Sequence, residues 1–145
     1  MKKRYIPLLC AMLLCLTACG NTSYADGTYT GRSADYVNEE DPEAGNGYGV
    51  VTLTISGGQI TACDYKTYEL DGTLKDEDYG KENGEIKNKD FYNKAQKARA
   101  ACDNYAQQLV AKQNVKDVDA VSGATVNYAE FKEAVAEALK QAAQQ

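Results

Sequence analysis

The chain has 145 residues, with 16 basic and 21 acidic side chains, no histidine and a formal net charge of −5. The missing imidazole excludes Ser-His-Asp and Cys-His catalysis and removes the commonest metal ligand. The acidic balance argues against nucleic acid or anionic lipid as a partner, because both carry negative charge.

The first 18 residues have the composition of a secretory signal peptide. A basic start at residues 2–4 precedes an apolar run over about residues 5–16, which is too short for a permanent membrane span. The run L-T-A-C, which ends at Cys19, resembles the lipobox of bacterial lipoproteins. That resemblance implies cleavage before Cys19 and a diacylglyceryl group on its thiol, which would anchor the protein at the extracytoplasmic face of the cell membrane. An ordinary signal peptide that ends with a chance cysteine is the alternative.

Removal of residues 1–18 would leave 127 residues, the size of a single domain. That part keeps all the acidic residues but loses three basic ones, so its formal charge is −8. We expect a lipidated tether over residues 19–25 and a folded domain over 26–145. Cys63 and Cys102 are the cysteines of this domain, and both a disulfide and two buried thiols remain open.

The first half of the domain predicts β-structure. Residues 28–33 are expected to form a first strand, and residues 37–47 are typical of a loop. Apolar and threonine side chains alternate over residues 48–56, which predicts a strand with one buried face. Gly57-Gly58 predicts a hairpin turn, followed by a returning strand that ends near Leu70.

Residues 71–90 are charged and contain glycine, which is typical of a solvated loop. The run D-E-D-Y-G at 76–80 offers carboxylates like those of a calcium loop. Lys81, however, stands at the sixth position, where such a loop requires glycine. We therefore expect no calcium site there.

The second half predicts two helices. Residues from about 89 to 112 lack proline and glycine and are rich in helix formers. Their apolar residues recur at spacings of three and four, which predicts one buried face made of Phe91, Ala95, Ala98, Cys102, Tyr105 and Leu109. A final helix is expected over Tyr128–Ala142, with Asn127 as its N-cap and Glu130 as the capping partner. These elements predict a small α+β domain, in which an antiparallel β-sheet is packed with two α-helices.

The segment between the predicted helices, D-A-V-S-G-A-T, combines two hydroxyl groups with very small side chains. Unpaired N–H groups at the start of a helix favour an anion, particularly a phosphate. Gly123 permits a tight backbone, Ala124 leaves the approach open, and Thr125 presents a hydroxyl group. From these features alone, a phosphate loop and an ordinary capped turn both remain open.

The same segment, residues 119–125, resembles the D-x-x-[ST]-G-A-[ST] motif of the FMN-binding domain family. The similarity continues into residues 48–62 and 129–139 and covers roughly residues 26–140. It implies that Thr125 is joined by a phosphoester bond to the phosphate of FMN. It also implies that Asp119 is the acidic position of the motif and that a phosphate loop is shaped by Ser122, Gly123 and Ala124.

Two further points concern the flavin site. Family members often continue with T-S one residue after the motif, whereas this chain has Asn127-Tyr128. Tyr48 and Tyr65 lie near the predicted hairpin and could contact the flavin ring, or they could be ordinary residues of a half-buried sheet.

The family resemblance implies maturation by an exported flavin transferase that uses FAD and magnesium. It further implies a lipid-anchored electron carrier without its own substrate site, which takes electrons from a membrane quinone or NADH dehydrogenase and passes them to an external acceptor. The absence of predicted transmembrane helices favours the flavin lipoproteins over the subunits of sodium-pumping quinone reductases. The alternatives are a non-redox signalling or binding lipoprotein whose signal peptide yields a peptide pheromone, and a reductase for a small acceptor such as fumarate. For the reductase, 127 residues leave no room for a substrate domain.

Overall fold

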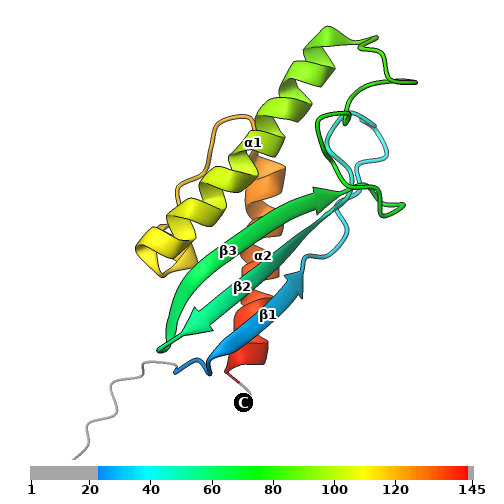
Figure 1. Ribbon diagram of the computed structural model, residues 1–145. Helices are drawn as coiled ribbons and strands as arrows, with labels where there is room; N and C mark the ends of the chain where they lie inside the picture. Colours follow the sequence, from blue (N-terminus) through cyan, green and yellow to red (C-terminus); the bar gives the residue numbers. More distant parts are fainter. Residues whose placement is uncertain (1–22, 144–145) are drawn as a thin grey trace, which may run out of the picture.

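The computed structural model describes residues 23–143. The elements follow the order β1 (Gly27–Arg32), β2 (Tyr48–Ser56), β3 (Gln59–Tyr68), α1 (Lys89–Lys112), a short 3-10 helix η1 (Val115–Asp117) and α2 (Thr125–Ala142). The strands form one antiparallel sheet in the order β1-β2-β3, which confirms the predicted α+β fold (Figure 1). The predicted signal peptide and Cys19 lie outside the described residues.

The core lies between one face of the sheet and the two helices. Helix α1 packs on β3, whereas α2 packs on β1 and β2 (Figure 1). On β2 the predicted alternation is confirmed, because Val51, Leu53 and Ile55 are buried. Gly57 and Gly58 both have positive φ, at 61° and 74°, which is the backbone of a tight hairpin turn. Strand β3 ends at Tyr68, two residues before the predicted end.

Helix α1 has the predicted bounds. The Asn88 side chain caps its start by accepting a hydrogen bond from the backbone N–H of Phe91 at 3.0 Å. Most of the predicted apolar face is buried, but Phe91 and Ala98 are only half-buried. Both side chains border a cavity, which explains why they are not covered.

Helix α2 begins at Thr125, three residues before the predicted start. The prediction of Asn127 as N-cap is therefore wrong, and so is its capping pair with Glu130. The amide of Asn127 instead donates to the Ala98 carbonyl at 3.2 Å and contacts the Cys102 sulfur at 3.3 Å, which ties α2 to α1. The early start follows from Gly123, whose positive φ turns the chain directly into the helix.

The prediction of a solvated loop over residues 71–90 is wrong at Lys75, which is only 7% exposed. Its Nζ donates to the Gly45 carbonyl at 2.8 Å, so this connection packs against the loop between β1 and β2. Residues just before β1 also contact the domain, because the Ala25 N–H bonds the Ala142 carbonyl at 3.1 Å.

Cys63 and Cys102 are both free thiols in the structure. Burial raises the pKa of Cys63 to about 12 and that of Cys102 to about 11, so both are protonated and unreactive near neutral pH. Within residues 23–143, no helix is long and apolar enough to cross a membrane.

Candidate functional site

The loop before α2 is shaped by glycine and leaves the start of the helix uncapped. Gly123 has φ +82°, and a turn joins the Ala124 N–H to the Val121 carbonyl at 3.1 Å. No side chain of the described residues caps α2. A side chain built on Gly123 would meet nothing nearer than the Lys97 ammonium, at 4.0 Å. The first N–H groups of α2 are therefore free to bind an anion.

The buried Tyr105 of α1 holds this loop in place. Its hydroxyl donates to the Ala124 carbonyl at 3.0 Å and accepts from the Val121 N–H at 2.9 Å. The two bonds lie on either side of Ser122 and Gly123, so one side chain fixes both ends of the turn. Burial raises the pKa of Tyr105, and the hydroxyl stays protonated and able to donate.

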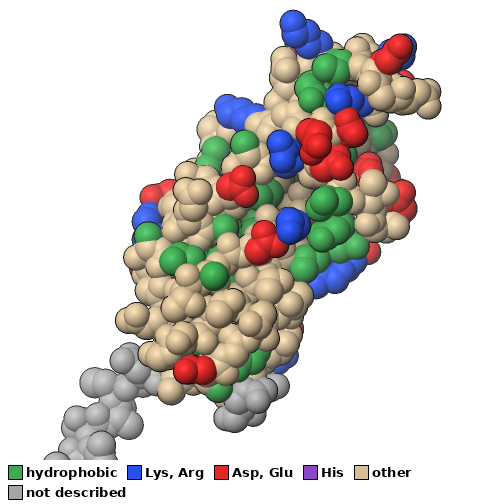
Figure 2. All heavy atoms as spheres, viewed as in Figure 1, with side chains coloured by type: hydrophobic (Ala, Val, Ile, Leu, Met, Phe, Trp, Pro, Cys, Tyr) green, Lys and Arg blue, Asp and Glu red, His purple; other side chains and the backbone are tan. Residues whose placement is uncertain are grey.

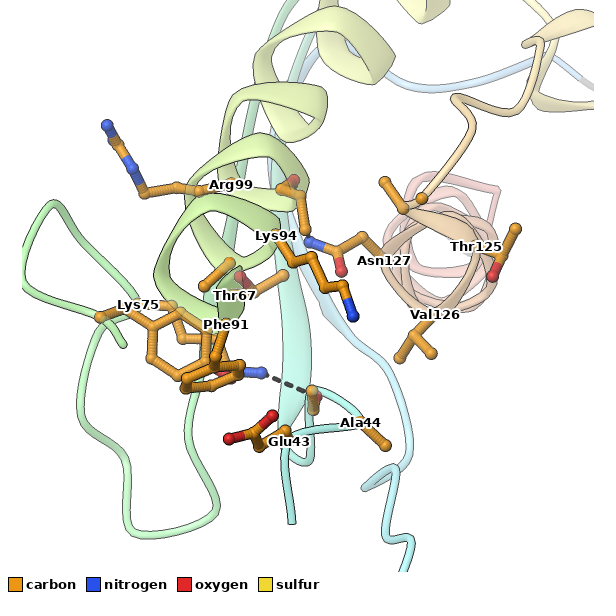
Figure 3. A pocket seen from close by; sticks show the side chains of 16 residues that line it. Glu43, Ala44, Thr67, Lys75, Phe91, Lys94, Arg99, Thr125, Val126 and Asn127 are labelled. Atoms are coloured by element: carbon orange, nitrogen blue, oxygen red, sulfur yellow. Dashed lines mark hydrogen bonds between the residues drawn. The ribbon is translucent and has the colours of Figure 1, made fainter. Parts of the chain in front are cut away.

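A cavity of about 260 Å³ opens beside the uncapped helix start. Three segments border it: the loop at residues 43–45, the side of α1 from Phe91 to Arg99, and residues 123–127 (Figure 3). Thr67 of β3 and two side chains of the 71–90 connection, Lys75 and Tyr79, complete the wall. Phe91 and Tyr79 meet edge to face, with ring centroids 6.0 Å apart, so one side of the cavity is aromatic.

The cavity is basic although the whole chain is acidic. Lys75 and Lys94 line it, Arg99 contributes to the wall with its guanidinium directed away from the interior (Figure 3), and Glu43 is the acidic side chain among the described lining residues. On the visible surface, acidic and basic side chains are interspersed where the connection between β3 and α1 lies (Figure 2). The excess of basic side chains in the lining favours an anionic ligand inside the cavity.

The structure brings Gly123, Ala124 and Thr125 to the cavity. Thr125 is exposed at the rim, on the side of α2 that faces away from α1, while Asn127 points toward α1 (Figure 3). The Thr125 hydroxyl is thus accessible from solvent at the first residue of the helix.

Ser122 and Asp119 do not line the cavity. Asp119 pairs with Lys112 at 2.8 Å, and its backbone exchanges two hydrogen bonds with the Gln108 side chain. Asp119 therefore ties the loop to the end of α1. The sequence placed Asp119 in the motif but did not predict its contacts with Lys112 and Gln108.

Tyr48 and Tyr65 also lie away from the cavity lining. Tyr65 is buried, packs on Phe131 with ring centroids 4.9 Å apart, and donates to the Asn127 carbonyl at 2.6 Å. Tyr48 stacks on Tyr68, with ring centroids 5.4 Å apart. Both are structural residues of the sheet, and the aromatic wall comes from Phe91 and Tyr79 instead.

Comparison with known protein families identifies the family of this chain. A family profile described as the FMN-binding domain matches residues 44–140, which include the loop and every cavity-lining residue except Glu43. The chain belongs to the FMN-binding domain family. A search of curated proteins finds no match.

Two solved structures are similar to this FMN-binding domain. A crystal structure of a Clostridium perfringens protein aligns with a TM-score of 0.60 and 23% identity, over 83% of this chain and 90% of that one. A solution structure of a Clostridium thermocellum protein aligns with a TM-score of 0.43 and 26% identity, over 81% and 91% of the two chains. The first of these supports the fold.

The residues present fit FMN. Uncapped N–H groups at the start of α2, from Thr125 onward, suit its phosphate, and the basic cavity beside them suits an anion. Phe91 and Tyr79 offer an aromatic surface to a flat ring. The cavity is smaller than a typical ligand pocket of about 300–1,000 Å³, so part of a flavin would extend beyond it.

Sequence reasoning missed the side chains that make the cavity basic. Lys75 lies in a charged run that gives no periodic signal, and Lys94 and Arg99 resemble solvated residues of an amphipathic helix. Tyr105 was predicted to be buried, and a buried phenol needs a hydrogen-bond partner. Its two partners, however, are backbone groups that only the folded loop supplies.

Proposed function

We propose that this protein is a lipid-anchored, extracytoplasmic electron carrier that holds FMN through a phosphoester bond to Thr125. The observation that carries the proposal is the place of Thr125. Its exposed hydroxyl stands at the first residue of an uncapped helix, at the rim of a basic cavity. An attached phosphate would lie against free N–H groups, and the ring would reach the cavity beside them.

In this proposal the protein and the bound cofactor have separate roles. Bound FMN supplies the electron-transfer chemistry, while the chain positions it and sets its electrostatic surroundings. Lys75 and Lys94 provide positive charge, and Tyr105 keeps the loop rigid. The partners are an FAD- and magnesium-using flavin transferase for maturation and a membrane quinone or NADH dehydrogenase as electron donor. Cys19 carries the lipid anchor that holds the protein close to this donor.

The attachment is tested by intact-mass measurement after co-expression with such a transferase. The wild-type protein is expected to be yellow and to gain the mass of FMN less water. Thr125→Ala removes the accepting oxygen and is expected to abolish the mass gain completely. Thr125→Ser keeps a hydroxyl group and is expected to remain loaded.

Thr61→Ala serves as a matched control, because it removes an exposed threonine hydroxyl from β3. This variant is expected to load like the wild type. Covalent flavin on Thr125→Ala would refute the attachment site. A wild-type protein that stays colourless with an active transferase would favour the non-redox lipoprotein instead.

A further inference from the structure

The interior of the domain holds a carboxylic acid that the proposed function leaves unused. Glu130 of α2 is only 4% exposed, and its Oε1 atom is buried without a hydrogen-bond partner among the described residues. Buried carboxylates are normally hydrogen-bonded or paired, because desolvation of the charge is costly. An orphaned carboxyl oxygen therefore points to a role in which the group changes its protonation state.

Glu130 does not line the cavity, but it lies on the helix that forms part of the cavity wall. It stands one helical turn after Val126 and Asn127, which line the cavity wall. A side chain on Gly49 would meet the Glu130 Cβ at 3.1 Å, and one on Gly47 would meet the Lys75 Nζ at 2.8 Å. Glu130 therefore packs against the start of β2, Lys75 packs against the residue just before it, and Lys75 itself lines the cavity.

Lys75 connects Glu130 electrostatically to the contents of the cavity. Burial raises the pKa of Glu130 to about 7, the positive charge of Lys75 opposes this rise, and the negative charge of Glu133 adds to it. Burial also lowers the pKa of Lys75. The other titratable groups that interact with Glu130 from the packed elements are neutral near pH 7: Tyr65, Tyr79 and Cys102. On β1, Arg32 pairs with Asp35 at 2.7 Å on the exposed face.

We propose that Glu130 binds a proton when the flavin in the cavity is reduced, with Lys75 as the cation that couples the two sites. A reduced, anionic ring competes with Glu130 for the single charge of Lys75, and it also repels the carboxylate directly. Both effects increase the proton affinity of Glu130. This inference rests on the proposed function.

The step balances in electrons, protons and charge. Two electrons from the membrane dehydrogenase and one proton from solvent reach the ring, and a second solvent proton converts the Glu130 carboxylate into a neutral acid. The total charge of the buried site is unchanged, so a low-dielectric interior does not have to hold an additional negative charge. On reoxidation, both electrons pass to the acceptor and both protons return to solvent.

The test is a redox titration of flavin-loaded protein at several pH values, followed by absorbance. For a two-electron couple, each proton taken up changes the midpoint potential by about 30 mV per pH unit. Above pH 7 the wild type is expected to show the two-proton slope, and Glu130→Gln only the one-proton slope. Below pH 6 Glu130 is already protonated, and the two slopes are expected to coincide.

Two further variants make the outcome specific. Lys75→Gln removes the cation that keeps Glu130 ionised in the oxidised protein, so it is expected to show the one-proton slope between pH 7 and 8. If Glu130→Gln does not fold, Lys75→Gln tests the same coupling. Glu137→Gln removes an exposed charge from the same helix and is expected to keep the two-proton slope.

The outcomes separate the two proposals. Loaded wild-type and Glu130→Gln proteins with equal slopes above pH 7 would overturn the role of Glu130 and leave the flavin carrier intact. A wild-type protein that takes up no flavin overturns the proposed function and this inference together.

Discussion

At the scale of single residues, the loop before α2 is held by side chains that hydrogen-bond its backbone. Tyr105 bonds two backbone groups on either side of the Ser122-Gly123 turn, while Tyr128 bonds the Val118 carbonyl at 2.8 Å. The two tyrosine rings contact each other, with centroids 5.5 Å apart. The conformation of the loop before α2 is therefore set by side chains of α1 and α2, outside residues 119–125.

Tyr105→Phe is expected to lower the free energy of unfolding by about 1–3 kcal/mol, because it leaves the Val121 N–H without its partner and removes one of the two hydrogen bonds that the Ala124 carbonyl accepts. Tyr128→Phe removes one hydrogen bond from a half-buried site and is expected to cost about 1 kcal/mol or less. Urea unfolding followed by circular dichroism measures both. Equal losses in the two variants would contradict the special role of Tyr105.

Prediction from the sequence succeeds for residues whose environment is local. Gly123 was expected to have a special backbone, and its φ of +82° confirms it. Asn127 was expected to cap a helix, yet its amide bonds α1 instead, because a residue 29 positions earlier in the chain comes within reach. Lys75 was expected in solvent, and it is buried by the loop that carries Gly45. Contacts between residues far apart in the sequence cannot be predicted from local sequence pattern or composition.

At the scale of elements, the fold depends on the close approach of β1 to α2. Gly31 of β1 faces the helix, and a Cβ atom added there would lie 1.9 Å from the Ala134 carbonyl oxygen and 2.6 Å from the Ala138 nitrogen. The sequence predicted a strand over residues 28–33 and a helix over Tyr128–Ala142, so both elements were expected. It did not reveal this contact, because a glycine within a strand is equally consistent with a bulge or a bend.

Gly31→Ala is expected to reduce the free energy of unfolding by about 3 kcal/mol or more, since the added methyl group meets backbone atoms that cannot move independently of α2. Thr28→Ala on the exposed face of the same strand is the control and is expected to change it by less than about 0.5 kcal/mol. Chemical denaturation of both variants gives the comparison. A Gly31→Ala protein as stable as the control would mean that β1 and α2 pack less closely.

At the scale of the whole molecule, an acidic protein encloses a basic cavity and two buried residues of opposite charge, Lys75 and Glu130. The chain carries a net charge of −5, yet Lys75 and Glu130 lie in its interior at 7% and 4% exposure. Burial of such groups rarely stabilises a fold, because the loss of hydration exceeds much of their attraction. A cost in stability is therefore expected, and it depends on pH through Glu130.

The pH dependence of the apoprotein measures this cost. The pKa of Glu130 is raised from its ordinary value of 4.5 to about 7, so the folded state binds more protons than the unfolded state between these values. The contribution of Glu130 to the free energy of unfolding is therefore largest below pH 4.5. It is lost as the pH rises through 7, and the total loss is at most about 3 kcal/mol.

Glu130→Gln does not titrate and is expected to gain stability relative to the wild type over the same interval. Denaturant unfolding at a series of pH values measures the difference, with Glu137→Gln as the exposed control. A difference between wild type and Glu130→Gln that stays constant from pH 4 to 8 would show that Glu130 keeps an ordinary pKa in the folded protein.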